Sequence, residues 1–168
     1  MVVYIDIETE GLNAYKQRIT CIGIQVVKQR KVIIEEAIYH RDEKKLLQQF
    51  LDIYNRYSDN IYETITWNGE KFDHPYIYVR CLKHSLKYCV VNGEDIKLHF
   101  PEFLFDKWRR PSLNDAAEFL ELGIEKSADG ADAPYMFKYG KIAELKRYCL
   151  QDVRIMRKIN VELKRRGN

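Results

Sequence analysis

Val2-Val-Tyr-Ile-Asp-Ile-Glu-Thr9 places two carboxylates at the end of a strongly apolar stretch. The β-branched and aromatic residues of Val2–Ile7 predict a buried strand. Alternate side chains of a strand share a face, so Tyr4, Asp6 and Glu8 point the same way. Two like charges this close repel each other unless a cation lies between them. The stretch therefore predicts either a metal site or a strand that has already ended, with both carboxylates in solvent.

Strands and helices alternate along the rest of the chain. Further strands are predicted at 19–27, 32–39, 61–67 and 95–100, helices at 42–57, 75–83, 112–122 and 141–165, and a loop at 125–139. The polar link Lys28–Lys31 predicts a hairpin between the second and third strands. Asp42 and Ser112 are the expected N-caps, and Asp115 would complete a capping box. Strands that first meander and then alternate with helices predict one mixed α/β sheet flanked by helices.

Length and composition fit a single globular unit over residues 1–168. Hydrophobic residues make up 46% and charged residues 32%, which excludes a disordered or low-complexity chain. The 28 basic and 25 acidic residues leave a net charge of +3, which neither identifies nor excludes a nucleic-acid binder.

The chain ends and the cysteines predict a cytoplasmic protein. The N-terminus reaches the carboxylate of Asp6 without a basic lead, so no signal peptide is expected, and no apolar run approaches the roughly 20 residues of a membrane span. The cysteines lack zinc-like spacing, which favours free, buried thiols in a reducing compartment. A Cys81–Cys89 disulfide is the alternative.

Two further segments carry carboxylates at informative positions. In Asn68-Gly-Glu-Lys-Phe-Asp-His-Pro75, Asp73 lies at the start of a helix, where it is either an ordinary N-cap or a site residue. His74 is more typical of a surface residue, and Phe72 of a core anchor. In the last helix, Asp152 occupies the missing position of an apolar stripe, with Tyr148 one turn earlier. The stripe comprises Ile142, Leu145, Cys149, Met156, Ile159 and Leu163.

A carboxylate within an apolar stripe is costly unless it is paired or binds a metal, or unless the helix turns it to solvent. With Asp152, four acidic residues come from three separate segments. Mg²⁺ and Mn²⁺ prefer such oxygen ligands. Two such ions about 3.5–4 Å apart can activate a water and stabilise a leaving oxygen, which is the chemistry of phosphodiester hydrolysis.

The three segments resemble the three motifs of a known nuclease family. Asp6-Ile-Glu8-Thr9, Asn68-Gly-x-x-Phe72-Asp73-x-Pro75 and Tyr148-x-x-x-Asp152 are similar to the exonuclease motifs of DEDDy-type, DnaQ-like 3′→5′ exonucleases of the ribonuclease H-like superfamily. The resemblance extends over nearly the whole chain. Residues 130–139 and 147–153 are also similar to predicted exonucleases related to family B DNA polymerases. The implied fold is a five-stranded mixed sheet whose second strand is antiparallel to the others.

The resemblance implies a role for each acidic motif residue. Asp6 would bridge two Mg²⁺ or Mn²⁺ ions, and Glu8 and Asp152 would complete the tighter site. Asp73 would hold the second ion through water. Tyr148 would orient or deprotonate the attacking water. These five residues form the implied catalytic set.

The resemblance also implies a substrate and its contacts. The substrate would be the 3′ end of DNA, preferably single-stranded, with Thr9, Leu12, Asn68 and Phe72 forming the pocket around the terminal nucleotide. Glu10 departs from the family pattern, where many relatives have a threonine or another small residue, and would alter metal affinity or strand approach.

Two other functions fit the same motifs. The chain would be a 3′→5′ exoribonuclease, or a catalytically weak module that binds nucleic acid or protein. Candidate phosphate contacts are Lys107, Arg109, Arg110, Lys138, Lys141, Lys146 and Arg147, and candidate stacking residues are Trp108 and Tyr135. The alternative for each of them, which the sequence favours, is an ordinary solvated surface residue. Replication or repair proteins are conceivable partners that the sequence does not identify.

Overall fold

A five-stranded mixed sheet forms the centre of the computed structural model, which describes residues 1–102, 110–124 and 132–167. Its strands are β1 (Val2–Thr9), β2 (Ile19–Lys28), β3 (Lys31–Ile38), β4 (Glu63–Thr66) and β5 (Gly93–Asp95). The spatial order is β3-β2-β1-β4-β5. Strand β2 is antiparallel to β1 and β3, whereas β4 is parallel to β1, and β5 to β4. The predicted ribonuclease H-like sheet, with its second strand antiparallel, is confirmed.

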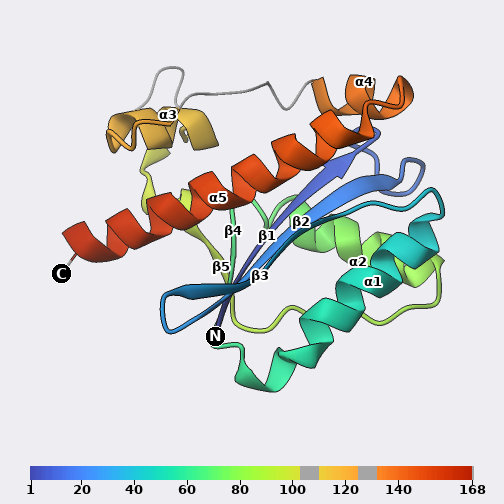
Figure 1. The fold of residues 1–168 in the computed structure, drawn as a ribbon, viewed down its shortest axis with the longest axis horizontal. Coiled ribbons are helices and arrows are strands. Elements are labelled where there is room, and N and C mark those ends of the chain that lie inside the picture. Colours follow the sequence, from blue (N-terminus) through green and yellow to red (C-terminus); the bar gives the residue numbers. More distant parts are fainter. Residues whose placement is uncertain (103–109, 125–131, 168) are drawn as a thin grey trace.

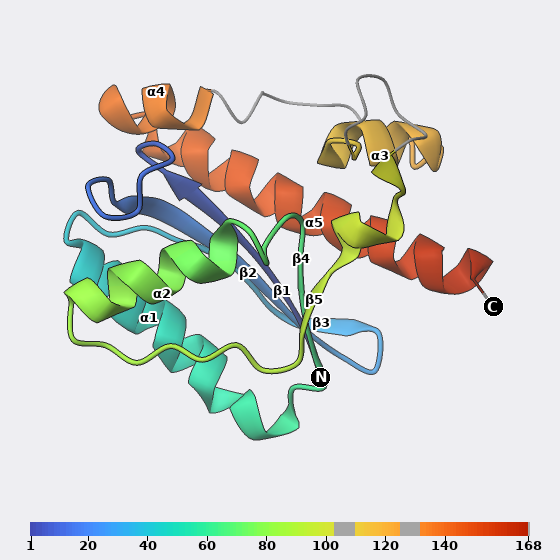
Figure 2. The same cartoon turned by 180° about the vertical axis from the view of Figure 1, so that it is seen from behind.

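Helices cover both faces of this sheet (Figures 1 and 2). They are α1 (Glu43–Arg56), α2 (Asp73–Lys83), α3 (Leu113–Phe119), α4 (Ala133–Lys138) and α5 (Ile142–Arg166), with short 3₁₀ turns η1 (Ser58–Asn60) and η2 (Ile96–His99). Helices α1 and α2 lie on one face, and α5 crosses the other face beneath α3. The carboxyl end of β1 and the N-terminal part of α5 meet at one end of the molecule.

The alternation of β1 divides the core between the two faces. Val3, Ile5 and Ile7 pack with α1 and α2, while Tyr4 packs with α5. The Tyr4 hydroxyl accepts a hydrogen bond of 2.9 Å from Asn160 Nδ2, and both residues are buried. Asp6 and Glu8 follow Tyr4 at every second position of β1, so their side chains lie on the same face of the sheet as that of Tyr4. This is the face that α5 covers, as their spacing predicts.

Two predicted helix starts are confirmed by their caps. The Asp42 carboxylate accepts hydrogen bonds from the Lys44 and Lys45 amides. Ser112 and Asp115 exchange the two hydrogen bonds of a capping box. Each cap satisfies amide donors that have no partner within the helix.

Three predicted elements differ from the structure. Helix α2 begins at Asp73 rather than Pro75, and β5 occupies 93–95 because this segment pairs with β4, whereas 96–99 turns into η2. Residues 133–138 form α4 within the predicted loop, since a proline suits a first turn and Ala133 and Met136 find a buried surface. The remainder of that loop, 125–131, and the candidate contacts Lys107, Trp108 and Arg109 lie outside the described residues.

The four cysteines are free, so the alternative of a Cys81–Cys89 disulfide is wrong. Three are buried as expected, whereas Cys89 is exposed. Among the residues that the structure describes, no helix combines the length and apolar character that crossing a bilayer requires.

Candidate active site

A cleft of about 430 Å³ opens at the carboxyl end of β1. All five residues of the predicted catalytic set line it, although they come from β1, α2 and α5. The full lining is Asp6, Ile7, Glu8, Thr9, Gly11, Leu12, Trp67, Phe72, Asp73, Pro134, Tyr148 and Asp152. The alternative in which the strand has already ended and both carboxylates lie in solvent is therefore wrong, because Asp6 and Glu8 face this cleft.

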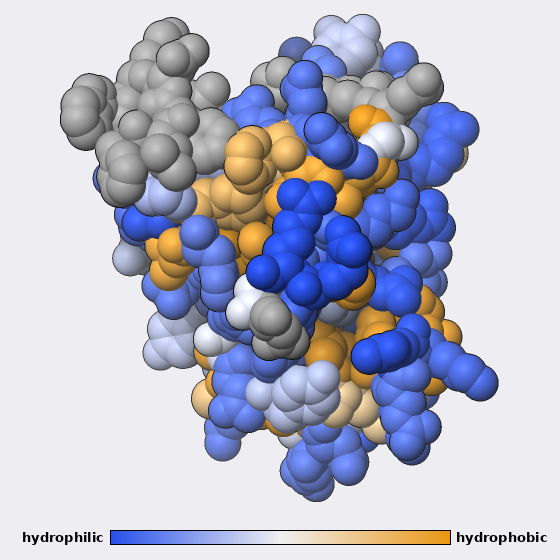
Figure 3. All heavy atoms as spheres, turned by 90° about the vertical axis from the view of Figure 1, so that its left-hand side faces the viewer, coloured by the Kyte–Doolittle hydropathy of each residue, from blue (hydrophilic) through white to orange (hydrophobic). Residues whose placement is uncertain are grey.

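A second hollow, of about 850 Å³, lies at the other end of β1. The N-terminus, the β2–β3 hairpin and the C-terminal part of α5 surround it. Figure 3 faces this end of the molecule, where hydrophilic side chains are interspersed with apolar ones. Its lining includes the basic side chains of Arg157, Lys164 and Arg165 and none of the predicted catalytic set. The acidic site residues therefore belong to the cleft at the carboxyl end of β1.

Strand β1 brings Asp6 and Glu8 close to Cys149 of α5. One ligand atom from each of these three residues lies within 4.8 Å of the other two. Burial and the neighbouring Cys21 thiol raise the pKa of Cys149 well above its usual value, so this thiol stays protonated. It lies 3.9 Å from Asp6 Oδ2, where it acts as a weak hydrogen-bond donor. The oxygen ligands of the cluster are thus the two carboxylates.

Asp73 reaches the same place from the opposite face of the sheet. Strand β1 pairs with β4 only as far as Tyr4, so the part of β1 that follows has no pairing with β4 on that edge. The Ile7 amide donates instead to Asp73 Oδ1 at 3.1 Å. Asp73 is the first residue of α2 and Phe72 is its N-cap, so the prediction of an N-cap role for Asp73 is wrong. Its buried carboxylate is held across the end of β1.

Helix α5 contributes Tyr148 and Asp152, one turn apart. Asp152 is partly buried and lines the cleft, so the alternative register that turns it to solvent is wrong. Both residues line the cleft, where the negative charge of Asp152 acts on the Tyr148 hydroxyl. Burial, followed by the negative charges of Asp152, Glu8 and Asp6, raises the pKa of Tyr148, so the phenol stays protonated at neutral pH.

Gly23 allows α5 to approach the sheet at this point. It pairs with Asp6 across β1 and β2, and a Cβ added here would lie 2.8 Å from Val153 Cγ2 and 3.0 Å from the Cys149 carbonyl. Such contacts are too short for a side chain. The absence of a Cβ at Gly23 therefore allows the short distance between α5 and the part of the sheet that carries Asp6 and Glu8.

Replacing Gly23 with alanine should displace α5 and impair the cleft. We expect a loss of about 1–3 kcal/mol in the free energy of unfolding, as for other overpacked cores, and lower affinity for Mn²⁺. Thermal melting and Mn²⁺ titration would measure both. Gly93→Ala is the control, because its added Cβ would meet Val90 at an ordinary 3.4 Å. Equal behaviour of the two variants would contradict this role of Gly23.

The carboxylates of the cleft repel one another in the absence of a cation. Burial, and then the charges of Glu8, Asp152 and Asp73, raise the pKa of Asp6 well above its usual value. Burial and Asp152 do the same for the pKa of Glu8. Burial raises the pKa of Asp73 to about 7, although two amides donate to it. This donor set fits a hard divalent cation, whose charge would compensate the buried carboxylates.

Divalent-ion binding should strengthen as pH rises. Asp73 is protonated below its pKa of about 7, and the pKa values of Asp6 and Glu8 are raised as well, so these groups must release protons to bind a metal. Conversely, their ionisation destabilises the metal-free fold between the pKa of the unfolded chain, about 4, and the raised folded pKa. We therefore expect the increase in Tm caused by saturating Mn²⁺ to grow from pH 5 to pH 8. A pH-independent increase would contradict this electrostatic account.

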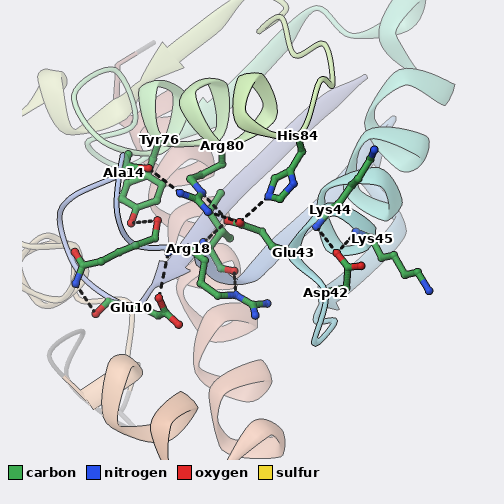
Figure 4. Close-up of polar contacts among 12 residues, drawn as sticks. Glu10, Ala14, Arg18, Asp42, Glu43, Lys44, Lys45, Tyr76, Arg80 and His84 are labelled. Carbon is green, nitrogen blue, oxygen red and sulfur yellow. Dashed lines mark hydrogen bonds and ion pairs between the residues drawn. The ribbon is translucent and has the colours of Figure 1, made fainter.

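A buried ion pair supports the loop that follows β1. Glu43 accepts hydrogen bonds from Arg80 Nε at 2.8 Å, His84 Nε2 at 2.9 Å and the Ile19 amide at 2.8 Å (Figure 4). Burial opposes the charge of Glu43, but these donors outweigh it and lower its pKa. Arg80 Nη1 also donates to the Ala14 carbonyl at 3.0 Å. The ion pair therefore ties α1 and α2 to the loop at residues 10–18.

The same loop is held directly beside the cleft. The Gly11 carbonyl accepts two hydrogen bonds, one from the Tyr76 hydroxyl at 2.9 Å and one from the Thr9 hydroxyl at 2.8 Å. Gly11 and Leu12 line the cleft, and the Leu12 side chain is 87% exposed. A large apolar side chain held in this position is available for contact with a ligand.

The predicted substrate contacts differ in where they lie. Thr9, Leu12 and Phe72 line the cleft, whereas Asn68 does not. The Asn68 backbone has φ +66°, its amide donates to Asp95 Oδ1 at 2.8 Å, and its carbonyl accepts from the Phe72 amide. These contacts place Asn68 in the turn that leads into α2. Glu10 is directed away from the carboxylates, since its Oε2 accepts from the Arg18 amide at 3.3 Å.

Sequence reasoning misses four lining residues, namely Ile7, Gly11, Trp67 and Pro134. Trp67 follows β4 and has the appearance of a core aromatic in the sequence. Pro134 belongs to α4, which the sequence presents as a loop. The only local signal for Pro134 is the suitability of proline for a helical first turn.

An acidic cluster at the carboxyl end of β1, in a sheet of order β3-β2-β1-β4-β5, defines the class of ribonuclease H-like proteins. The sequence profile of the RNase_H superfamily matches residues 3–164, and the chain belongs to this superfamily. A protein of Methanocaldococcus jannaschii described as uncharacterised is 34% identical over 139 residues, which cover 80% of this chain and 74% of that protein.

The fold is also similar to part of a DNA polymerase. The structure of the family B DNA polymerase from the hyperthermophilic archaeon Pyrobaculum calidifontis matches 97% of this chain with a TM-score of 0.75 and 19% sequence identity. The matched region is 24% of the polymerase chain, so this chain spans about a quarter of that protein's length. At this identity the likeness shows a shared fold. Membership of the superfamily suggests nuclease activity. Nucleases of this superfamily generally use divalent metal ions, and the cluster of Asp6 and Glu8 is a candidate site for such an ion.

Proposed function

We propose that the protein is a 3′→5′ exonuclease of the DEDDy, DnaQ-like type, which removes nucleotides from the 3′ end of single-stranded DNA. The observation that carries the proposal is the convergence of four carboxylates and one tyrosine in a single cleft. An anionic phosphodiester can enter such a cleft only with cations present. The 3′→5′ direction rests on the resemblance of the three motifs to this family.

Each side chain has a role in the proposed reaction. Asp6, Glu8, Asp73 and Asp152 would hold two Mg²⁺ or Mn²⁺ ions, which supply an activated water and stabilise the leaving oxygen. The protonated Tyr148 hydroxyl is suited to orienting the attacking water by donating or accepting a hydrogen bond.

The walls of the cleft would hold the terminal nucleotide. Its 3′-hydroxyl would contact Glu8 and the backbone at Thr9. Leu12, which is exposed on the rim, would pack against the terminal base, with Phe72 on another part of the lining. Asn68 would act through the turn that it forms ahead of α2.

Degradation of end-labelled oligonucleotides tests the function. Single-stranded DNA and RNA of the same sequence are incubated with Mg²⁺, Mn²⁺ or excess EDTA, and the products are resolved as ladders. We expect stepwise loss from the 3′ end, resistance of a 3′-phosphorylated strand and no cleavage in EDTA. Full activity in EDTA, or release of nucleotides from the 5′ end, would overturn the proposal. Preferential degradation of RNA would instead establish the exoribonuclease.

A further inference from the structure

Two tyrosines and two lysines gather on the outer surface of α4. Tyr135 and Tyr139 are 53% and 59% exposed, and their ring centroids lie 4.3 Å apart. Lys141 Nζ lies 5.7 Å from the centroid of the Tyr135 ring, and Lys138 Nζ lies 5.6 Å from that of Tyr139. Exposed aromatic faces interleaved with cations are the pattern by which proteins bind single-stranded nucleic acids.

The position of α4 places this surface at the mouth of the cleft. Figures 1 and 2 both show α4 beside the carboxyl end of β1 and the start of α5. Pro134 lines the cleft, and the next residue along the chain is Tyr135. On its inner side, α4 buries Met136 in the same apolar cluster as Tyr148. The helix therefore connects the catalytic cleft to the exposed tyrosines.

Contacts on its inner side hold α4 in place. The Arg18 guanidinium lies 5.3 Å from the centroid of the Phe137 ring and donates to the carbonyls of His40 and Arg41 at 2.9 Å and 2.7 Å. After α4, the Lys141 amide donates to the Met136 carbonyl at 2.8 Å. The helix is thus supported from beneath, and the two exposed tyrosine rings already lie against each other, with an ammonium group near each, before a ligand binds.

The two lysines are available to a phosphate. Lys141 pairs with Glu144 at 3.4 Å, but both side chains are nearly half exposed, and such a pair contributes little. Lys138 has no acidic partner among the residues that the structure describes. Both ammonium groups can therefore contact an anion without breaking a strong interaction.

We propose that Tyr135, Lys138, Tyr139 and Lys141 form a platform for the nucleotides that precede the 3′-terminal one. This inference rests on the proposed exonuclease function. The tyrosine rings would stack on unpaired bases, and the lysines would contact the adjacent phosphates. Because bases within a duplex are already stacked on their neighbours, the platform would favour single strands. It would also make binding depend on strand length, since the terminal nucleotide alone does not reach it.

Kinetics on substrates of different length separate the platform from the catalytic cleft. The variant Tyr135→Ala/Tyr139→Ala is compared with wild type on a twelve-residue thymidine oligonucleotide and on the p-nitrophenyl ester of thymidine 5′-phosphate. We expect KM for the oligonucleotide to rise about tenfold, as for other base-stacking residues, with kcat unchanged. Turnover of the small ester should not change.

Matched variants separate the contribution of the aromatic rings from those of the tyrosine hydroxyls, of exposed tyrosines elsewhere and of the lysine charges. Tyr135→Phe/Tyr139→Phe keeps the rings and should behave as wild type. Tyr62→Ala/Tyr78→Ala removes tyrosines of similar exposure, 59% and 50%, that do not line the cleft, and should also leave KM unchanged. Lys138→Ala/Lys141→Ala should reduce the slope of log affinity against log salt by about 0.7 for each phosphate that the protein no longer neutralises.

Binding distinguishes failure of the platform from failure of the proposed function. Fluorescence anisotropy with the labelled oligonucleotide in EDTA requires neither catalysis nor entry of a phosphate into the acidic cleft, so it measures binding to the platform. If wild type binds about tenfold more tightly than the alanine variant but cleaves no substrate, the platform holds and the exonuclease proposal fails. An unchanged KM and affinity for the oligonucleotide would overturn the platform. Equal impairment on the ester and the oligonucleotide would also overturn it, since α4 would then act only by shaping the cleft.

Discussion

Asp6→Asn should abolish nuclease turnover and yet stabilise the metal-free protein. Asp6 is the carboxylate assigned to both ions, and its pKa is raised by burial and by Glu8, Asp152 and Asp73. An amide cannot supply the negative charge that divalent ions require, so we expect turnover to fall at least about a thousandfold, the upper range for loss of one charge-stabilising group. The same change removes one of the carboxylate charges that repel one another in the metal-free protein.

Two measurements test this prediction together. Single-turnover cleavage at saturating Mn²⁺ gives the loss of rate, and thermal melting in EDTA gives the stability. A gain of about 1 kcal/mol would raise Tm by roughly 2–4 °C for a domain of this size. Asp52→Asn, at an exposed position on α1, is the control and should change neither quantity. Near-normal turnover of Asp6→Asn would refute its assignment to both ions.

Tyr148→Phe should lower turnover while leaving metal binding intact. The substitution keeps the buried ring and deletes only the hydroxyl of a residue that lines the cleft beside Asp152. Positioning of a reactive water by such a group is worth about 10²–10⁴-fold. We expect a fall of at least about tenfold, set low because bound metal ions themselves acidify water. Asp152→Asn should instead weaken Mn²⁺ binding directly.

Turnover and Mn²⁺ affinity, measured on both variants, separate the two roles. Tyr54→Phe is the matched control, because it also deletes a buried hydroxyl, one that bonds Thr64 at 2.9 Å outside the cleft. It should lower stability and leave kcat unchanged. Full turnover of Tyr148→Phe on both DNA and RNA would reduce Tyr148 to a packing residue and remove the third motif from the family assignment.

The periodicity of single elements was enough to predict which faces carry the acidic residues. The alternation of β1 sets Asp6 and Glu8 on one face, and the helical repeat of α5 sets Asp152 in its apolar stripe. Both patterns depend on neighbouring residues alone, and the structure brings their carboxylates into one cleft with Asp73. The catalytic roles of these residues remain predictions that the variants above would test.

Strand β5 and helix α4, which sequence reasoning did not place correctly, depend on contacts between residues that are distant in the sequence. Strand β5 is a polar Gly93–Asp95 segment that is ordered by pairing with β4, and α4 forms where Met136 can be buried beside Tyr148. Neither segment carries a periodic pattern of its own, because each is too short to show one.

The sequence by itself determined the order of the main elements, the sheet class and the identity of the acidic residues. Only the tertiary structure decided how these residues meet. It shows that Gly23 lets α5 approach Asp6, that Asp73 replaces a missing strand partner of Ile7, and that Pro134 of α4 closes one side of the cleft. The physical reason is that periodicity reports which face of an element is buried, whereas the distance between two elements depends on the side chains that lie between them.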